Sequence, residues 1–409
     1  MKFRPSDEAL PVIELRARRN SLHPWIFKKM VRPPKKRLPC GAPVTVVTRE
    51  GEFVGRGIYN PVSNIAVRLL TERESEPLDW SFFRAKLAEA RRLREEILGI
   101  GRQSDSYRLI HGEADGLSGL MVDKYADVLV IEPYSAGYVY FMDALTKGLR
   151  ELYPSCRMVV RPDAKHAVRE GVEKECAELA RRHPAPESVV IQENGVRMKV
   201  DFRAGHKTGF FLDQRENRRE AAQMSAGRRV LDLFCYTGGF SIAAALGKAA
   251  SVTGVDLDEK ALRTAGENAR MNGAQVEFLH ADVFDHLRGM VARGDLADLV
   301  IADPAKLAGV RDEIPRARRT YGDLNRLAMK AVRPGGVLLT CSCSGLISEP
   351  DFLSILTRSA AEAGVVFQAF RIAGAAGDHP VSSIFPEGRY LKAVFARIYP
   401  ATSRRVVAD

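Results

Sequence analysis

The pattern of apolar and polar positions changes twice along the 409 residues. Up to about residue 75, apolar and polar residues alternate in short runs, which is typical of half-buried strands. Over 76–186, helical spacing and short apolar runs are mixed. Over 187–409, short continuous apolar runs alternate with helical segments, which is the pattern of a parallel sheet with helices between its strands. We therefore predict an α/β chain with three regions, 1–75, 76–186 and 187–409.

The first region predicts a small β-barrel. Its strands are expected in APVTVVTREGEFVGRGIYNPVSNIAVRLLT, where β-branched and polar residues alternate around turns at Glu50-Gly51 and Asn60-Pro61. The preceding stretch PPKKRLPCG has too many prolines for a regular element. Several short strands within about seventy residues resemble a PUA domain, which is an RNA-binding β-barrel.

The middle region predicts a mixture of helices and strands. Apolar residues at helical spacing indicate a helix over 80–100. Strands separated by Gly- and Asp-rich turns are expected over 107–135, followed by a helix over 136–152. A proline-containing linker at 180–188 then leads to a hairpin, whose turn we place at Asn194-Gly195.

The third region is organised around the run VLDLFCYTGGFS, from Val230 to Ser241. Its apolar residues predict a buried strand, Thr237-Gly238-Gly239 predicts a tight turn, and the small residues that follow predict a helix. In such a unit, backbone N–H groups and a helix N-terminus face a ligand.

Each of the next four predicted strands ends in a carboxylate or a thiol. The strand ends carry Asp256, Asp282, Asp303, and the pair Cys341 and Cys343. The carboxyl ends of parallel strands share one edge of the sheet, where ligands bind. There Asp256 could accept hydrogen bonds from ribose hydroxyls. Asp282 could accept from an adenine amino group or cap a helix, and Asp303 would lie where substrate meets cofactor.

The two cysteines allow two interpretations. They lie two residues apart, so on an extended strand they share a face, either as small core residues or with one thiolate acting as a nucleophile. A zinc site would need further ligands, and no second pair lies near in sequence. Because His111, Glu113 and Asp115 are more typical of a polar loop than of a metal cluster, we expect no metal.

Positive charge is concentrated in the first region. The chain has a net charge of +11, and residues 1–75 contribute 15 Lys and Arg against seven Asp and Glu, an excess of eight. Such an excess favours a polyanionic partner. Aromatic side chains near Trp25 could stack on bases or pack in a small core. An arginine-rich stretch at 311–323, predicted as a loop, could close over RNA phosphates. The expected RNA-binding residues are Arg16, Arg18, Arg19, Lys28, Lys29, Trp25, Arg316, Arg318 and Arg319.

The remaining composition favours a cytoplasmic protein. No apolar run is long enough to span a membrane, and the N-terminal residues do not resemble a signal peptide. The six cysteines are few and scattered, which fits a reducing compartment.

Several short motifs occur together in a fixed order. They are HKTGFFLDQREN, DLFCYTGGFS, DPAK, TYGDLN, TCSCSG and DHP. With them the chain resembles the large-subunit ribosomal RNA cytosine-5 methyltransferases that carry an N-terminal PUA domain. The likeness extends from HPWIF at 23–27, through DSYRLIHGEADGL at 105–117, to PEGRYLKA at 386–393. It implies a Rossmann-like methyltransferase domain, S-adenosylmethionine as cofactor and large-subunit ribosomal RNA as partner.

The resemblance also implies roles for individual residues. Cys343 matches the family's motif cysteine and would attack carbon 6 of cytosine, while Asp303 would bind the base edge. A free thiol is mostly protonated at neutral pH, so Lys306 or the cofactor's sulfonium would favour the thiolate. Ala305 stands where the family usually has a second proline. The implied cofactor-binding residues are Phe234, Tyr236, Thr237, Gly238, Gly239, Asp256, Asp282, Asp303 and Gln214.

Other functions remain open on the sequence alone. The same sheet and Asp303 are compatible with an enzyme that methylates a guanine nitrogen in ribosomal RNA. That reaction needs no cysteine nucleophile. A non-catalytic RNA-binding ribosome-assembly factor is a further alternative, although the intact turn and strand-end carboxylates argue against it. A dehydrogenase is disfavoured because nothing resembles a hydride-transfer site. The chain could be a monomer or a homodimer.

Overall fold

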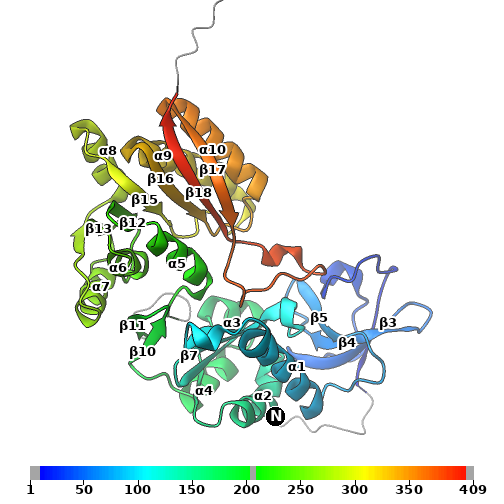
Figure 1. The fold of residues 1–409 in the computed structure, drawn as a ribbon. Helices are drawn as coiled ribbons and strands as arrows, with labels where there is room; N and C mark the ends of the chain where they lie inside the picture. The colour runs from blue at the N-terminus through cyan, green and yellow to red at the C-terminus, as the bar shows by residue number, and fades with distance from the viewer. Residues whose placement is uncertain (1–9, 203–208, 402–409) are drawn as a thin grey trace, which may run out of the picture. The chain divides into compact units, whose positions relative to one another are not determined.

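The structure is a computed structural model that describes residues 10–202 and 209–401 (Figure 1). The chain divides into two compact units. The first contains the chain up to residue 192 with segments 200–212 and 377–388, and the second contains the rest. The regions expected at 1–75 and 76–186 thus belong to one unit. Residues 377–388 also belong to this first unit, although the strands on either side of them in the sequence belong to the second.

The first region forms the predicted small barrel. Its strands have the order β1-β3-β4-β5-β2. Backbone hydrogen bonds from Arg16 to Met30 (2.8 Å) and from Arg32 to Glu14 (2.9 Å) join the two edges of this sheet. All five strands contribute residues to a shared apolar core, and along β3 alternate residues are buried. The strands are β1 (Val12–Glu14), β2 (Trp25–Phe27), β3 (Ala42–Val47), β4 (Phe53–Tyr59) and β5 (Ile65–Thr71).

The middle region is a four-stranded sheet, β6-β7-β8-β9, with helices packed on it. Helix α2 connects the parallel strands β8 and β9, and it packs with α1 over a common core. The predicted helices over 80–100 and 136–152 are confirmed in these positions, with the first passing into a π-helical turn at Leu93–Ile97. The elements are α1 (Trp80–Arg92), β6 (Ser106–His111), β7 (Leu120–Tyr125), β8 (Val128–Pro133), α2 (Tyr138–Leu152), β9 (Arg157–Val160), α3 (Ala164–Glu170) and α4 (Glu173–Arg182).

A hairpin of β10 (Ser188–Glu193) and β11 (Val196–Asp201) follows. Its turn lies at the predicted residues, where Asn194 and Gly195 both adopt positive φ values of 49° and 83°. Two successive residues with positive φ match the twist of antiparallel strands, which explains the Asn-Gly pair.

The second unit is built on a seven-stranded sheet of order β14-β13-β12-β15-β16-β18-β17. All neighbouring pairs are parallel except those of β18, which runs antiparallel to β16 and β17. The strand order reverses beside β12, because β13 lies on one side of it and β15 on the other. Ligands bind at such a switch point. The strands are β12 (Arg229–Leu233), β13 (Ser251–Asp256), β14 (Glu277–His280), β15 (Ala297–Ala302), β16 (Val332–Ser342), β17 (Val365–Ala373) and β18 (Lys392–Pro400).

Helices cover both faces of this sheet, as Figure 1 shows. Helices α5 and α6 contribute to the core on one face, and α8, α9 and α10 contribute to the core on the other. The predicted α/β class is therefore confirmed. Within the described ranges, no helix is both long and apolar enough to cross a membrane. The helices are α5 (Arg215–Gln223), α6 (Gly239–Leu246), α7 (Glu259–Met271), α8 (Val283–Arg293), α9 (Ile314–Ala331) and α10 (Glu349–Ala363).

Candidate active site

The turn between β12 and α6 holds an unusual backbone conformation. Phe234 and Tyr236 both have positive φ values, 62° and 50°, which side chains other than glycine seldom adopt. Gly238 has a φ of 85°, and a Cβ there would lie 3.1 Å from the Phe278 ring and 3.2 Å from Ala265. Only glycine fits that position without displacing its neighbours. Backbone strain of this kind gathers at ligand-binding sites.

Asp256 supports this turn from the end of β13. Its Oδ2 accepts a hydrogen bond from the Tyr236 backbone N–H (2.8 Å), and its Oδ1 accepts from the Asp258 N–H (2.9 Å). Each carboxylate oxygen can accept a second hydrogen bond. Asp256 could therefore hold the turn and still bind ribose hydroxyls.

Asp282 lies two residues beyond the end of β14 and caps α8. Its Oδ1 accepts from the backbone N–H groups of Phe284 (2.9 Å) and Asp285 (3.0 Å). The structure therefore bears out the capping role that the sequence allowed. The second carboxylate oxygen remains available for an adenine amino group.

Asp232 is a buried carboxylate within β12 for which the sequence pattern predicted no role beyond the strand. Its Oδ2 accepts a hydrogen bond from Ser241 Oγ (2.6 Å), whereas its Oδ1 is buried without a partner in the described part of the chain. Burial raises the pKa of Asp232 to about 7, and the nearby charges of Asp303 and Asp256 act in the same direction. The signal in the sequence was one carboxylate inside an otherwise apolar strand.

The loops after β15 and β16 are tied together by Ser344. Its Oγ accepts hydrogen bonds from the backbone N–H groups of Leu307 and Ala308, both at 3.1 Å, and it lies 3.1 Å from the Tyr321 hydroxyl. These bonds fix the Asp303–Lys306 loop against the end of β16. Asp303 is half-buried there.

The two cysteines differ in environment. Cys341 lies within β16 and is fully buried in the core, and burial raises the pKa of its thiol well above the usual value. Strand β16 ends at Ser342, so Cys343 lies beyond it and is only partly buried. The Cys343 Sγ is 3.9 Å from the Pro304 carbonyl oxygen. Cys343 and the Asp303 loop are therefore neighbours at the sheet edge.

Gln214 and Lys306 lie in contrasting surroundings. Gln214 is buried, and its amide oxygen accepts a hydrogen bond from Asn217 Nδ2 (2.6 Å). Lys306 is exposed. Backbone hydrogen bonds from Gly309 and Val310 lower the pKa of Glu313, and the charge of Lys306 acts in the same direction. The His206, Lys207 and Thr208 part of the HKTGFF motif lies outside the described residues.

The predicted RNA-binding residues of the barrel differ in their solvent exposure and in the hydrogen bonds and ion pairs that they already make. Arg18, Lys28 and Lys29 are exposed. Arg16 is exposed too, and its Nε donates to the Val31 carbonyl oxygen (2.9 Å). Arg19 is ion-paired with Glu72 (2.5 Å) and donates to the His23 carbonyl oxygen (2.6 Å).

Trp25 is engaged within the first unit. Its indole N–H donates to Glu113 Oε1 (2.8 Å), its ring packs against Phe385 at a centroid distance of 5.0 Å, and the Arg68 guanidinium lies over it at 5.4 Å. These contacts favour the packing interpretation of Trp25 over stacking on an RNA base.

The arginine-rich stretch at 311–323 is helical, so its prediction as a loop was wrong. A short 3-10 turn at Arg311–Glu313 passes into α9, which buries Ala317, Tyr321 and Leu324 at helical spacing. Pro315 stands in the first turn, where proline suits a helix. Arg316 and Arg319 are exposed, and Arg318 pairs with Asp351 (2.6 Å).

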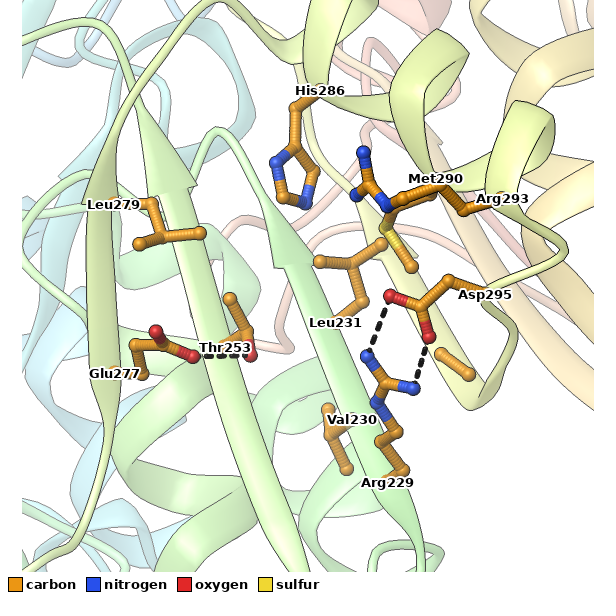
Figure 2. Close-up of a pocket in the computed structure, with 11 residues that line it drawn as sticks. Arg229, Val230, Leu231, Thr253, Glu277, Leu279, His286, Met290, Arg293 and Asp295 are labelled. Atoms are coloured by element: carbon orange, nitrogen blue, oxygen red, sulfur yellow. Dashed lines mark hydrogen bonds and ion pairs between the residues drawn. The ribbon is translucent and has the colours of Figure 1, made fainter.

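A separate hollow of about 200 Å³ lies toward the amino ends of the strands, beside α8 (Figure 2). Figure 2 shows Arg229 and Asp295 paired at its rim, with Arg229 Nη2 3.0 Å from Asp295 Oδ2. Arg229 is the first residue of β12, whereas the strained turn follows the last. This hollow is therefore distinct from the site at the carboxyl ends.

Comparisons with known proteins identify the class to which this fold and site belong. Residues 108–380 match the family described as S-adenosylmethionine-dependent methyltransferase, and residues 16–72 match the PUA-like domain. The chain belongs to this S-adenosylmethionine-dependent methyltransferase family. The PUA-like match agrees with the barrel predicted for the first region.

The curated relatives are more specific. The chain is 41% identical over 380 residues to ribosomal RNA large subunit methyltransferase I of Aeromonas hydrophila, covering 92% of this chain and 95% of that protein. It is 41% identical to the protein of the same name from Photobacterium profundum, with 90% and 94% covered. A solved structure described as a methyltransferase complexed with SAH has a TM-score of 0.77 at 20% identity, covering 95% of this chain and all of that one. That likeness bears on the fold alone.

The residues present at the switch point fit S-adenosylmethionine. The cofactor carries positive charge on its sulfonium and amino groups and presents two ribose hydroxyls. The unpartnered Asp232 Oδ1 is a buried acceptor suited to a cationic donor, and a positive ligand would relieve the repulsion among Asp232, Asp256 and Asp303. The free accepting capacity of Asp256 suits the hydroxyls.

Proposed function

We propose that this chain transfers the methyl group of S-adenosylmethionine to carbon 5 of a cytosine in large-subunit ribosomal RNA, with Cys343 as nucleophile. The observation that carries the proposal is the position of a partly buried Cys343 beside the Asp303–Lys306 loop, at the carboxyl edge of the sheet. The names of the relatives supply the substrate class. Such a substrate would place the chain in the cytoplasm with the ribosomes.

The chemistry of cytosine explains the need for a thiolate. Carbon 5 is a weak nucleophile until a group adds to carbon 6. The Cys343 thiolate would form a bond to carbon 6, and electron density moves to carbon 5, stabilised at the base edge. The cofactor, when bound, would supply an electrophilic methyl group: a bond from carbon 5 to the methyl group would form as the methyl–sulfur bond breaks, leaving S-adenosylhomocysteine. Loss of the carbon 5 proton then expels the thiolate and restores the double bond.

Asp303 would bind the amino and ring-nitrogen edge of the base and so stabilise the adduct. The rigid connection of its loop to Ser344 holds it beside Cys343. Preorganised groups of this kind lower the barrier because they need no rearrangement during the reaction. The base must also leave its stack to reach the edge of the sheet, which costs about a few kcal/mol.

The cofactor would lie across the carboxyl ends of β12, β13 and β14. The turn from Phe234 to Gly239 would face it with backbone N–H groups, Asp232 would accept from its amino group, and Asp256 from its ribose. Asp282 would accept from the adenine amino group. RNA would be bound through exposed basic side chains of the barrel and of α9, whose phosphate contacts would offset the cost of extracting the base.

The experiment is methylation of unmodified large-subunit RNA with radiolabelled cofactor, followed by nucleoside analysis. We expect label in 5-methylcytidine, and we expect it to disappear in Cys343→Ala. Cys341→Ala is the matched control, because it removes a buried thiol two residues away and should retain activity. Cofactor binding is measured for both variants to show that they fold.

Two other outcomes would replace the proposal. Label on guanosine that persists in Cys343→Ala would indicate methylation of a purine nitrogen. RNA binding without cofactor binding would indicate a non-catalytic assembly factor.

A further inference from the structure

We propose that Lys392 is the positioning residue whose ammonium group stabilises the thiolate of Cys343. This inference rests on the proposed function, because it assigns a partner to the nucleophile named there. Lys392 is the first residue of β18, and no role for it was expected from the sequence.

The position of Lys392 follows from strand pairing. In the antiparallel pair β16–β18, Lys392 lies opposite Ser342, the residue directly before Cys343. Its Nζ donates a hydrogen bond to the carbonyl oxygen of Ser344, the residue directly after Cys343, at 2.7 Å. A second bond of 2.8 Å goes to the Tyr390 carbonyl oxygen. The Lys392 backbone is therefore paired with the residue before the nucleophile, and its ammonium group is held against the carbonyl of the residue after it.

Lys392 is a buried cation without a carboxylate partner. The residue is 2% exposed, and within the described ranges no Asp or Glu forms an ion pair with it. Two carbonyl oxygens use two of its three donors. Lysine is rarely buried unless paired, because burial strongly disfavours the isolated charge. An anion formed at Cys343 would provide the missing counter-charge.

The charged groups around this pair support the assignment. Burial lowers the pKa of Lys392 to about 8, and the negative groups that oppose this shift are Cys343 and Glu349. Glu349, at the start of α10, is already ion-paired with Arg389 at 2.6 Å. Tyr321 of α9 and Asp303 also lie near Cys343, and both would disfavour a second negative charge there when ionised. Lys392 is thus the buried positive charge that can balance the thiolate.

A purely structural role for Lys392 makes a different prediction. If its two hydrogen bonds only tether the end of β16, then a neutral side chain that can still donate them should suffice. Lys392→Gln keeps a donor but removes the charge, and Lys392→Arg keeps the charge. The readout must therefore follow the ionisation of Cys343, and stability alone is insufficient.

The test measures the rate of Cys343 alkylation by iodoacetamide as a function of pH, with mass spectrometry to identify the modified cysteine. In the unaltered protein we expect the half-maximal rate below the ordinary thiol value of about 8.5. In Lys392→Gln the midpoint should rise by about one pH unit or more, because the loss of a neighbouring opposite charge has an effect of about this size. Lys392→Arg should restore it in part. Lys306→Gln tests the exposed lysine that the resemblance suggested for this role, and it should move the midpoint less than Lys392→Gln does.

Three outcomes are decisive. The role of Lys392 is overturned if the pH of half-maximal Cys343 alkylation in the unaltered protein is that of an ordinary thiol. It is also overturned if this pH is unchanged in a Lys392→Gln variant that still binds cofactor. Both outcomes leave the proposed function intact. The measurement on the unaltered protein needs no variant, so it tests the role of Lys392 even if Lys392→Gln fails to fold. Conversely, 5-methylcytidine formed by Cys343→Ala would overturn the proposed function, while the alkylation midpoint would still report on the Lys392–Cys343 pair.

Discussion

Asp232 and Ser241 share a hydrogen bond of 2.6 Å, and this bond satisfies only one of the two Asp232 carboxylate oxygens. The other oxygen is buried with no partner in the described part of the chain. A half-satisfied buried carboxylate is costly for the folded protein. A cationic ligand such as S-adenosylmethionine could donate a hydrogen bond to this second oxygen, and its binding would offset the cost in free energy.

The first prediction concerns cofactor affinity. Asp232→Asn removes the negative charge but keeps the size of the side chain. Hydrogen bonds to charged groups contribute roughly 1.5–3 kcal/mol, so we expect affinity for S-adenosylmethionine to fall by about tenfold to a hundredfold. Isothermal titration calorimetry measures this directly. Ser241→Ala is the control, because it keeps the Asp232 charge; unchanged affinity in Asp232→Asn would contradict the assignment.

The same variant has an opposite effect on stability without cofactor. The pKa of Asp232 is about 7 in the folded protein and near 3.8 when unfolded, so the folded state binds more protons between these values. Stability therefore falls as pH rises from about 4 to 7, by an amount on the order of a few kcal/mol. We expect Asp232→Asn to be more stable than the unaltered protein at pH 8, and the difference to vanish near pH 4. Urea unfolding at both pH values checks the sign.

Ser344 supplies the second prediction. Ser344→Ala removes the acceptor shared by the Leu307 and Ala308 N–H groups, so the Asp303–Lys306 loop loses its attachment to β16. Because small misplacements of a catalytic group cost up to about a hundredfold in rate, we expect single-turnover methylation to slow by roughly tenfold or more. Cofactor affinity should change little. Tyr321→Phe, which removes only the third contact of Ser344, should have a smaller effect, and equal effects would contradict this explanation.

Much of the fold could be predicted because local patterns and tertiary structure agree. The strand before the glycine turn, the hairpin at Asn194-Gly195 and the helix over 80–100 follow from periodicity and turn chemistry alone. The gathering of Asp256, Asp303 and Cys343 at one edge follows from the parallel arrangement of strands.

Other features depend on contacts between distant parts of the chain. Lys392 could not be connected with Cys343 from the sequence, because 48 residues separate it from Ser344, whose carbonyl it bonds. The many arginines of 311–323 suggested an exposed loop. The helix is nevertheless indicated by Ala317, Tyr321 and Leu324, which form an apolar stripe at helical spacing. The packing of Trp25 also could not be predicted from the sequence, because its partners Glu113 and Phe385 lie far along the chain.

The third prediction tests whether the hollow in Figure 2 is functional. Arg229→Ala breaks the pair with Asp295 at the rim of the hollow in Figure 2, at the opposite edge of the sheet from Cys343. Both side chains are partly exposed, so we expect a loss of stability of only about 0.2–1 kcal/mol. Methylation rate and cofactor affinity should stay unchanged. A tenfold loss of either rate or affinity in a fully folded Arg229→Ala variant would show that this hollow takes part in the reaction.

The fourth prediction concerns acid stability of the first unit. Burial lowers the pKa of His111 well below 6.5, and the positive charges of His379, Arg108 and Arg94 act in the same direction against Asp378. The unfolded chain therefore binds a proton near pH 6.5 that the folded chain does not. Stability should fall by roughly 1.4 kcal/mol per pH unit below pH 6.5. His111→Gln, which does not titrate, should flatten this dependence in urea unfolding at pH 7.5, 6.5 and 5.5; an equal slope would exclude His111 as its source.

The last prediction separates two neighbouring arginines that the sequence had grouped together. Arg18 is exposed, whereas the Arg19 side chain is only 9% exposed and is tied to Glu72 and to the His23 carbonyl oxygen. If Arg18 contacts an RNA phosphate, then Arg18→Ala should reduce the slope of log affinity against log salt concentration by about 1 and leave stability unchanged. Arg19→Ala should do the reverse, because it removes a largely buried side chain together with its hydrogen bond to the part-buried His23 carbonyl oxygen, at a cost of about 1 kcal/mol. Filter binding to large-subunit RNA over a range of salt concentrations, paired with thermal unfolding, distinguishes them. An unchanged salt slope in Arg18→Ala would remove this residue from the RNA interface and turn attention to Lys28 and Lys29.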